Sequence, residues 1–294
     1  MMVYSRNETQ LKARAKLNFT LDVVGRREDG YHKLETVMQS LVFCDRLYMK
    51  KIFKPNYLKV VSDVSWLQND ESNLVYRVAK FMKERYNIEE GIFINLQKRI
   101  PTSAGLGGGS ADAAAALVGI RNLFSLPLSL EEMLELGLEF GADIPFCIQR
   151  RTSFVEGIGE ILTPLPRVPH MYILIAKPPV LCSTKTIFKA FDPKNVAKRP
   201  DNEAFIYHLK KSDLHGMCKY MANSLESVTG CFYPVIHEIK TAMMEAGAIT
   251  SLMTGSGPSV FGIFERLPDA VFAKKRVASK FSDIEEIYVT RPFS

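Results

Sequence analysis

Alternation of hydrophobic and polar residues predicts a β-strand close to the start of the chain. Residues 15–24 place four apolar side chains on one face, at Leu17, Phe19, Leu21 and Val23. This two-residue period is typical of a strand with one buried face. A turn over residues 25–30 and a second strand-like run over residues 36–43 follow. We therefore expect two neighbouring strands.

Helical spacing of apolar residues marks several later segments. It extends over residues 73–86, and Ser129 with Glu132 forms a capping-box pattern for a helix that ends near Phe140, with Gly141 as its stop. Further helices are expected over residues 184–191, 202–210, 233–246 and 268–280. Further strands are expected over residues 91–97, 144–146, 152–156, 160–163, 171–176, 249–264 (broken by a glycine turn) and 284–289.

These elements do not follow a strict βαβ alternation, so the pattern predicts an α+β fold. The chain has 294 residues, which is enough for two modest domains. Residues 163–170 contain three prolines and are the best candidate linker. We therefore expect one domain over residues 1–163 and a second over residues 164–294.

Composition narrows the class of protein. With 47% hydrophobic and 24% charged residues, the chain has the composition of an ordinary globular protein. It has no apolar run long enough to span a bilayer and no secretory signal pattern, and its five scattered cysteines match neither a zinc site nor a disulfide framework. We expect reduced thiols and a cytoplasmic location. The net charge of +6 suits anionic ligands but discriminates little.

A glycine-rich loop is the strongest chemical signal. A strand-like run leads into KRIPTSAGLGGGSADAAAAL, and an alanine-rich helix is expected to start near Ser110. The loop glycines are Gly105, Gly107, Gly108 and Gly109. Glycines let neighbouring N–H groups turn toward one anion, and a helix start adds further unpaired donors. The loop therefore predicts a phosphate site, whereas the alternative is a turn that caps the helix and binds nothing.

This loop matches neither of two common phosphate signatures. A P-loop requires Gly-Lys-Ser/Thr, whereas Gly109 is followed by Ser110. The dinucleotide fingerprint G-x-G-x-x-G is not present at Gly105 or Gly107. A P-loop ATPase and a Rossmann dehydrogenase are therefore disfavoured.

Three other features could carry chemistry. A second glycine turn, Gly255-Ser256-Gly257-Pro258, could face another anion or simply close a hairpin. Lys16 lies between apolar residues on the first strand, and Asp143 follows a helix-ending glycine. Judged by position alone, a snorkelling lysine and a turn-capping aspartate are the commoner interpretations.

Four stretches together resemble the GHMP kinases, the family of galactose, homoserine, mevalonate and phosphomevalonate kinases. In chain order from residue 13 to residue 262 they are ARAKLNFTLDVVGRREDGYHKLETV, KRIPTSAGLGGGSADAAAAL, GADIPF and TGSGPSVFG. The first stretch resembles the branch whose acceptor is 4-diphosphocytidyl-2-C-methyl-D-erythritol, in the non-mevalonate pathway to isoprenoid precursors. The resemblance implies an N-terminal domain like domain 2 of ribosomal protein S5 and a ferredoxin-like C-terminal domain.

The resemblance also implies roles for individual residues. Lys16 and Asp143 match the catalytic pair, with Asp143 as the base that takes the proton of the acceptor 2-hydroxyl. Asn18 matches a position beside the acceptor, and His32 matches the residue that hydrogen-bonds the cytosine edge. Tyr31 and Phe188 match the two aromatic walls that stack on the base, and the remaining acceptor-side residues are Gly255, Ser256 and Gly257.

ATP is the phosphoryl donor that the resemblance implies. Asn73 and Leu74 match the adenine side, and Lys98 lies near the nucleotide. The phosphates are expected at Pro101, Gly105, Leu106, Gly107, Gly108, Gly109 and Ser110. No dedicated metal ligand is expected, because Mg²⁺ would be held mainly by the ATP phosphates. Relatives commonly have Gly-Gly where this chain has Arg150-Arg151, and proline where it has Lys185.

Two other functions compete with this interpretation. One is a GHMP kinase for another small alcohol, such as mevalonate or homoserine; the GYH sequence and Phe188 argue against it, since those acceptors carry no base. The other is a catalytically inactive ligand sensor or a nucleic-acid-binding module on the same fold. Retention of Lys16 and Asp143 argues against a sensor, and the scattered basic residues argue against a nucleic-acid surface. Small molecules, not membranes or nucleic acids, are therefore the expected partners, and the oligomeric state is left open.

Overall fold

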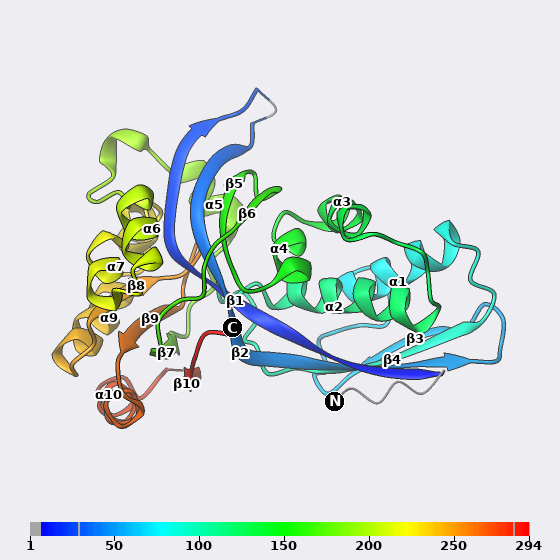
Figure 1. The fold of residues 1–294 in the computed structure, drawn as a ribbon. Helices are drawn as coiled ribbons and strands as arrows, with labels where there is room; N and C mark the ends of the chain where they lie inside the picture. The colour runs from blue at the N-terminus through cyan, green and yellow to red at the C-terminus, as the bar shows by residue number, and fades with distance from the viewer. Residues whose placement is uncertain (1–6, 29, 285, 294) are drawn as a thin grey trace. The chain divides into compact units, whose positions relative to one another are not determined.

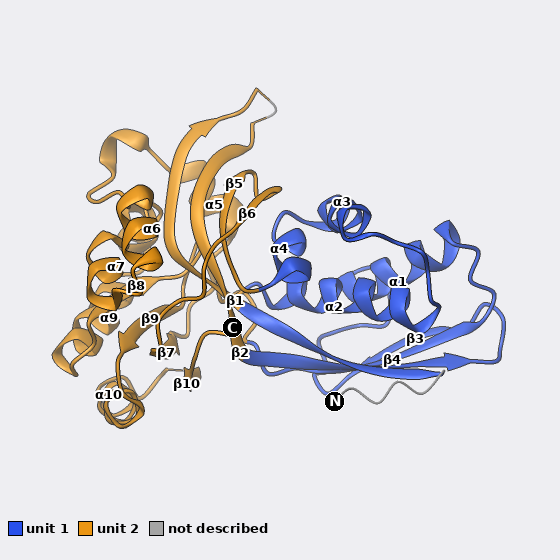
Figure 2. Cartoon of the chain, viewed as in Figure 1, with its two compact units in different colours: residues 1–15, 43–100, 107–150 blue, residues 16–42, 101–106, 151–294 orange. Residues whose placement is uncertain are grey.

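The computed structural model describes residues 7–28, 30–284 and 286–293 and contains two compact units (Figure 2). Unit 1 consists of Met1–Ala15, Phe43–Ile100 and Gly107–Arg150. Unit 2 consists of Lys16–Val42, Pro101–Leu106 and Arg151–Ser294. Neither unit is one continuous segment, and the expected division after residue 163 stays a prediction.

Two long strands run through segments of both units. β1 (Glu8–Arg26) and β2 (His32–Ile52) pair with each other and include the two strands expected from alternation. In β1 the residues from Ala15 to Val23 are all buried, polar ones included. The alternation therefore identified the strand but not the burial of its second face.

Unit 1 packs helices on a sheet. β4 (Gly91–Gln97) pairs antiparallel with the last part of β2, and β3 (Leu58–Ser62) runs parallel to β4. The helices are α1 (Leu74–Arg85), α2 (Gly108–Leu123), α3 (Leu130–Phe140) and α4 (Ile144–Gln149). Helices α1 and α2 pack on each other, and α1 packs on β3 (Figure 1). A Cβ at Gly119 would lie 2.3 Å from the Met49 sulfur, so glycine permits the close approach of α2 to the sheet.

The expected strand at residues 144–146 is wrong, because the structure has α4 there. Pro145 lies in the first turn of this helix, where its missing N–H costs no intrahelical bond. The capping box at Ser129 and the stop at Gly141 are confirmed for α3. The alanine-rich helix α2 begins at Gly108, two residues before its expected start.

Unit 2 contains an antiparallel sheet in the order β10-β7-β9-β8. Its strands are β7 (Tyr172–Lys177), β8 (Thr250–Met253), β9 (Val260–Phe264) and β10 (Glu286–Thr290). Numbered in chain order, this arrangement is 4-1-3-2. With α9 (Val235–Glu245) packed on β8 and β9, and α10 (Leu267–Lys280) packed on β7, β9 and β10, it is the expected ferredoxin-like arrangement.

The rest of unit 2 includes two further strands and several short helices. β5 (Thr152–Gly157) pairs with the first part of β2, and β6 (Ile161–Pro164) pairs with β5. The remaining helices are α5 (Thr184–Ala190), the 3₁₀ turn η1 (Pro193–Asn195), α6 (Asn202–Lys210), α7 (Leu214–Tyr220) and α8 (Glu226–Phe232). β3, η1, α7 and α8 have no counterpart among the predicted elements. Their short lengths leave little periodic signal.

The core of unit 2 joins segments that are distant in sequence. Leu21 and Val23 of β1 belong to the same buried cluster as Leu174 of β7 and Ile236 of α9. Backbone bonds add to this junction, since the Leu21 N–H donates to the Ala222 carbonyl at 2.9 Å. The first strand is therefore part of this core.

At Arg150 and Arg151, where this chain departs from the family pattern, the backbone geometry favours glycine. Arg150 and Arg151 have φ values of +66° and +70°, in the left-handed region that favours glycine. Glycine would thus suit both positions.

Among the described residues, no helix is long and apolar enough to cross a membrane.

Candidate active site

Lys16 is buried in the middle of β1, with 5% of its surface exposed. Its ammonium donates to Asn18 Oδ1 at 2.8 Å, and its backbone N–H donates to the Leu106 carbonyl at 3.0 Å. An ammonium out of water requires acceptors, and Asn18 provides one. The backbone bond also ties β1 to the first glycine loop.

Two contacts orient the Asn18 side chain, and a third holds its backbone N–H. The Thr36 hydroxyl donates to the Thr20 carbonyl, so its oxygen accepts from Asn18 Nδ2 at 2.8 Å. The Asn18 carbonyl oxygen is then directed toward Lys16. The Asn18 N–H donates to Thr254 Oγ1 at 3.2 Å. Thr36 and Thr254 were not identified from the sequence, where isolated threonines carry no signal.

The two glycine turns approach each other beside Lys16. A Cβ at Gly105 would lie 2.3 Å from the Thr254 carbonyl oxygen, and the φ of Gly105 is +71°. A Cβ at Gly255 would lie 3.2 Å from the Gly105 carbonyl oxygen and 3.5 Å from the Lys16 ammonium. Both glycines therefore allow an approach that a side chain would block. The structure brings together residues that the sequence placed about 240 positions apart.

Asn223 holds the second glycine turn in place. It is 5% exposed, and its Nδ2 donates to the Met253 carbonyl at 2.9 Å and to the Gly255 carbonyl at 2.8 Å. Ser256 is also held, since its hydroxyl lies 2.9 Å from that of Thr184 on α5. Nothing in the sequence pattern identified Asn223.

An aromatic cluster contains two of the predicted acceptor residues. The rings of His32 and Phe188 lie with centroids 5.3 Å apart and planes 36° from parallel. Phe191, three residues beyond Phe188, meets His32 edge-on at 6.2 Å. Its helical spacing from Phe188 could have identified it. Tyr31, which precedes His32 in the chain, is 64% exposed.

The cluster also affects the protonation of His32. Partial burial, and to a lesser extent the charge of Arg26, lowers the pKa of His32 below its usual value. The neutral imidazole has one donor and one acceptor nitrogen. It can therefore hydrogen-bond the edge of a heterocyclic base.

The start of α2 provides the helix part of the glycine loop. Gly107 caps the helix, and the Ala111 N–H makes the first intrahelical bond, to the Gly107 carbonyl at 2.8 Å. A Cβ at Gly109 would meet no described atom within 4 Å. The N–H groups of residues 108–110 precede the first helical bond and lie at the positive end of the helix dipole.

Lys98 lies close to this helix start, in a group of buried charged side chains. Its ammonium is 2.5 Å from Asp45 Oδ2 and 2.6 Å from Asp112 Oδ2, and the three side chains are at most 6% exposed. Burial raises the pKa of Asp112 well above its usual value, opposed by the charge of Lys98. Asp45 and Asp112 were not singled out from the sequence. Asp112 could have been, because it is the one charged residue in the run SADAAAAL.

The remaining predicted residues have local structural roles. Asn73 caps α1, accepting from the Val75 N–H at 2.9 Å, and donates to the Gln68 carbonyl at 3.0 Å. Leu74 is the first residue of that helix, and Pro101 is buried after the end of β4. Asp143 occupies the N-cap position of α4 in unit 1, where its side chain makes no capping hydrogen bond.

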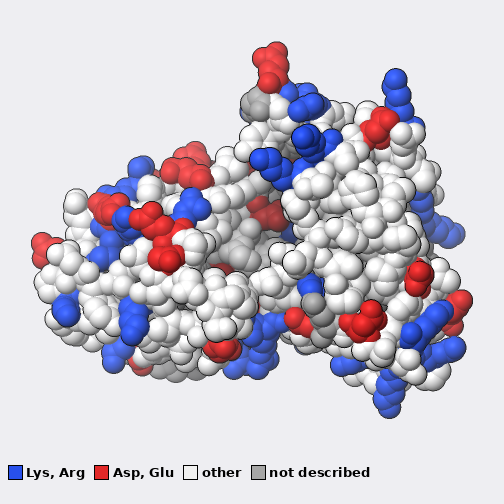
Figure 3. All heavy atoms as spheres, turned by 180° about the vertical axis from the view of Figure 1, so that it is seen from behind, with Lys and Arg blue, Asp and Glu red and all other residues white. Residues whose placement is uncertain are grey.

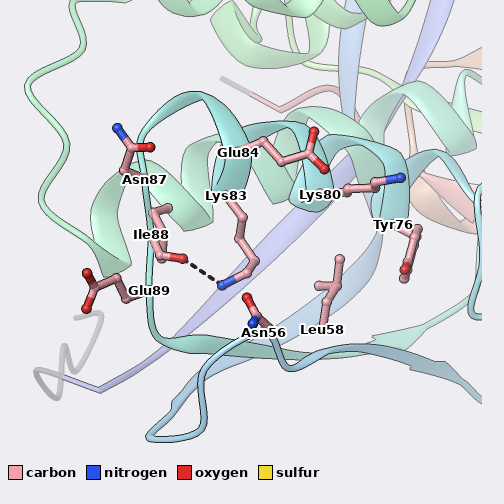
Figure 4. Close-up of a pocket in the computed structure, with 9 residues that line it drawn as sticks. All are labelled: Asn56, Leu58, Tyr76, Lys80, Lys83, Glu84, Asn87, Ile88 and Glu89. Atoms are coloured by element: carbon pink, nitrogen blue, oxygen red, sulfur yellow. Dashed lines mark hydrogen bonds between the residues drawn. The ribbon is translucent and has the colours of Figure 1, made fainter.

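Two surface features do not coincide with these residues. A hollow of about 480 Å³ lies beside α1 and β3, where Lys83 donates to the Ile88 carbonyl at 2.8 Å (Figure 4). None of the predicted site residues lines it. On the face in Figure 3, Lys and Arg are interspersed with Asp and Glu.

The described residues contain no group of three or more His, Cys, Asp or Glu placed to hold a metal ion.

Comparison with known proteins gives matches over almost the whole chain. The model of the GHMP kinases N terminal domain matches residues 73–151, and that of the GHMP kinases C terminal matches residues 205–283. A 4-diphosphocytidyl-2-C-methyl-D-erythritol kinase from Lachnospira eligens is 44% identical over 287 residues, 97% of this chain and 98% of the relative.

Solved structures agree with these matches. A crystal structure of a 4-(cytidine 5'-diphospho)-2C-methyl-D-erythritol kinase has a TM-score of 0.81 at 29% identity, covering 97% of this chain and 100% of that chain. A homoserine kinase from Cytophaga hutchinsonii has a TM-score of 0.75 at 20% identity, covering 96% of this chain and 94% of that chain. The second likeness shows a shared fold.

Proposed function

This chain belongs to the GHMP kinase family, and from that premise we propose that it is a 4-diphosphocytidyl-2-C-methyl-D-erythritol kinase. The reaction transfers the γ-phosphoryl group of ATP to the acceptor 2-hydroxyl. It gives the 2-phosphate and ADP, in the non-mevalonate pathway to isoprenoid precursors. The predicted α+β kinase fold agrees with both family matches and with the solved structure.

The packing of His32 against Phe188 is the observation that supports this acceptor. These residues come from β2 and α5, more than 150 positions apart, and together present an aromatic face beside a neutral imidazole. Stacking on such a face stabilises a bound base by about 1–3 kcal/mol. Tyr31, the exposed residue that precedes His32, provides the other stacking wall when the base binds. Mevalonate and homoserine have no group that would use this cluster.

The chemical step requires a base and a compensating positive charge. Asp143 takes the proton from the acceptor hydroxyl, and Lys16 stabilises negative charge on the nucleophile and the transferred phosphoryl group. Asn18 holds the Lys16 ammonium in one orientation. Phosphoryl transfer depends mainly on such positioning and charge stabilisation, because it leaves little covalent work to the protein.

The glycine loop provides the donor site. The N–H groups at the start of α2 bind the ATP phosphates, and the open space at Gly109 lets them approach the backbone. Asn73 and Leu74 lie on the adenine side. Mg²⁺ bound with the nucleotide would be held mainly by the phosphates and would supply charge neutralisation there. We place the reaction in the cytoplasm with these two small molecules as its partners.

ADP release by the purified protein tests this proposal. The protein is given Mg-ATP with 4-diphosphocytidyl-2-C-methyl-D-erythritol and, in parallel, with mevalonate and with homoserine. We expect turnover with the cytidylated alcohol alone. Turnover with another alcohol would support a kinase activity but would contradict the proposed role of the aromatic cluster in binding a base. ATP binding without turnover on any acceptor would instead favour a ligand sensor.

A further inference from the structure

We propose that Asp45, Lys98 and Asp112 form a buried charged triad that positions the first turn of α2, so that Lys98 supports the ATP phosphate site without itself contacting the nucleotide. The inference rests on the proposed use of ATP. It differs from the expectation that Lys98 lies next to the nucleotide as a ligand.

The triad joins three elements of unit 1. Asp45 belongs to β2, Lys98 follows β4, and Asp112 lies near the start of α2. Both carboxylates lie within 2.6 Å of the ammonium. Asp45 uses its other oxygen to accept from the Arg99 N–H at 2.5 Å and the Ile100 N–H at 2.7 Å. The end of β4 and the start of α2 are thus attached to one point on β2.

Lys98 lies directly against the helix start. A Cβ at Gly108 would be 3.0 Å from Ile100 Cγ2 and 3.5 Å from the Lys98 ammonium. A cation at a helix N-terminus opposes the helix dipole. The Asp45 carboxylate offsets that charge, and Asp112 accepts a second hydrogen bond from the same ammonium. The ammonium faces these carboxylates and is almost inaccessible to solvent.

Asp112 has one more unusual feature. Its Oδ1 is buried and has no hydrogen-bond partner among the described residues. Two carboxyl groups face a single ammonium, so a proton on Asp112 balances the charge of the triad. The raised pKa of Asp112, caused mainly by burial, agrees with this. A neutral amide of the same shape should therefore replace Asp112 better than alanine does.

Calorimetric titration with ATP tests the triad. We expect Lys98→Met and Asp45→Asn each to weaken ATP binding by about tenfold, and the double variant to be weakened by about the same factor, because groups that act as a unit are not additive. Asp112→Ala should weaken binding similarly, and Asp112→Asn should restore most of the loss. Asp269→Asn, in an exposed ion pair of unit 2, is the matched control and should leave binding unchanged.

Each other outcome overturns the proposal. Loss of ATP binding in Lys98→Met, with Asp45→Asn and Asp112→Ala unaffected, would make Lys98 a direct nucleotide ligand. Unchanged ATP binding in Lys98→Met would show that Lys98 does not position the phosphate site. If Lys98→Met does not fold, the comparison of Asp112→Ala with Asp112→Asn decides. Because the titration uses ATP alone, a wrong acceptor would leave it intact, and ADP release by the unaltered protein would reveal that separate failure.

Discussion

Lys16 and Asn18 lie two positions apart on β1, so their side chains leave the strand on the same face. Their contact follows from this spacing, and Thr36, which accepts from Asn18 Nδ2, gives the side-chain amide one orientation. By position alone, Lys16 was interpreted as an ordinary edge residue, and its proposed catalytic role came from the family resemblance. The structure adds the buried acceptor that makes the ammonium tolerable inside a sheet.

Replacing the proposed base should separate catalysis from binding. We expect Asp143→Asn to keep the fold and ATP affinity while turnover falls by about 10²–10⁴, the usual contribution of a positioned base. Single-turnover kinetics and ATP titration measure the two effects. Glu135→Gln, an exposed carboxylate on α3, is the control. A loss of less than about threefold in Asp143→Asn would reject the base assignment.

The pKa of His32 predicts how acceptor binding depends on pH. Burial and Arg26 lower this pKa, so His32 is neutral above about pH 6.5 and takes up its proton only at lower pH. The acceptor KM should be flat from about pH 7 to 8 and rise as the pH falls below the usual histidine value, while the KM for ATP changes less. Kinetics with NMR titration of His32 test this.

A variant of the neighbouring arginine provides the control for the pH profile. Burial and the charge of Arg26 both lower the pKa of His32, and Arg26→Gln removes the weaker of these two effects. The pKa of His32 should therefore rise but stay below its usual value. The acceptor KM should then begin to rise at a higher pH. An unchanged profile, or equal effects on both substrates, would contradict the role of His32 in binding the base.

At the scale of elements, α5 connects the aromatic cluster to the glycine turn. Phe188 lies in this helix and packs on His32, and Thr184 in the first turn meets the hydroxyl of Ser256. The same helix therefore contacts the proposed base site at one end and the turn beside Lys16 at the other. Sequence periodicity placed the helix but gave no indication of the hydroxyl pair.

Breaking that hydroxyl pair should affect the acceptor and not ATP. We expect Thr184→Val to raise the acceptor KM by about three- to tenfold, which corresponds to the loss of one hydrogen bond of roughly 0.5–1.5 kcal/mol. Thr184→Ser should recover most of the affinity. Thr186→Val, an exposed threonine on the same helix, is the matched control. An equal rise in the KM for ATP would contradict a selective role of the Thr184–Ser256 contact in acceptor binding.

At the scale of the whole molecule, the chain passes between its units several times. Unit 2 takes its core from β1 as well as from the second half of the chain, since Leu21 and Val23 are 4% and 3% exposed in it. A linker at residues 163–170 is a reasonable interpretation of the prolines, but this segment lies inside unit 2. Proline content reports local stiffness and not which segments share a core.

This shared core predicts that residues 164–294 do not fold alone. Burying a Leu or Val side chain stabilises a fold by about 1.5–3 kcal/mol, and a whole domain is stable by only about 5–15 kcal/mol. Losing Leu21 and Val23, with the backbone bonds of β1 to residues 222 and 224, should remove most of that margin. We expect the fragment to show no cooperative thermal transition by circular dichroism, unlike the full chain. Cooperative melting of the fragment would support an independent domain after residue 163.

The sequence by itself determined most of the helices and strands, the position of the glycine-rich loop before α2, and the family. Helical and strand periods, capping residues and glycine turns act over a few neighbouring positions, so they can be read without the fold. The order of the motifs gave the expected roles of Lys16, Asp143 and His32, and these roles stay predictions. The strand expected at residues 144–146 failed because an Ile-Pro-Phe run has no period that separates a short helix from a strand.

Only the tertiary structure decided which distant residues meet. Asn223 under the second glycine turn, Phe191 against His32, and the triad of Asp45, Lys98 and Asp112 each join segments with no local relation in the sequence. Such contacts depend on strand register and on how helices pack. The sequence alone also does not distinguish a charged residue that is buried and paired from one that is exposed to solvent.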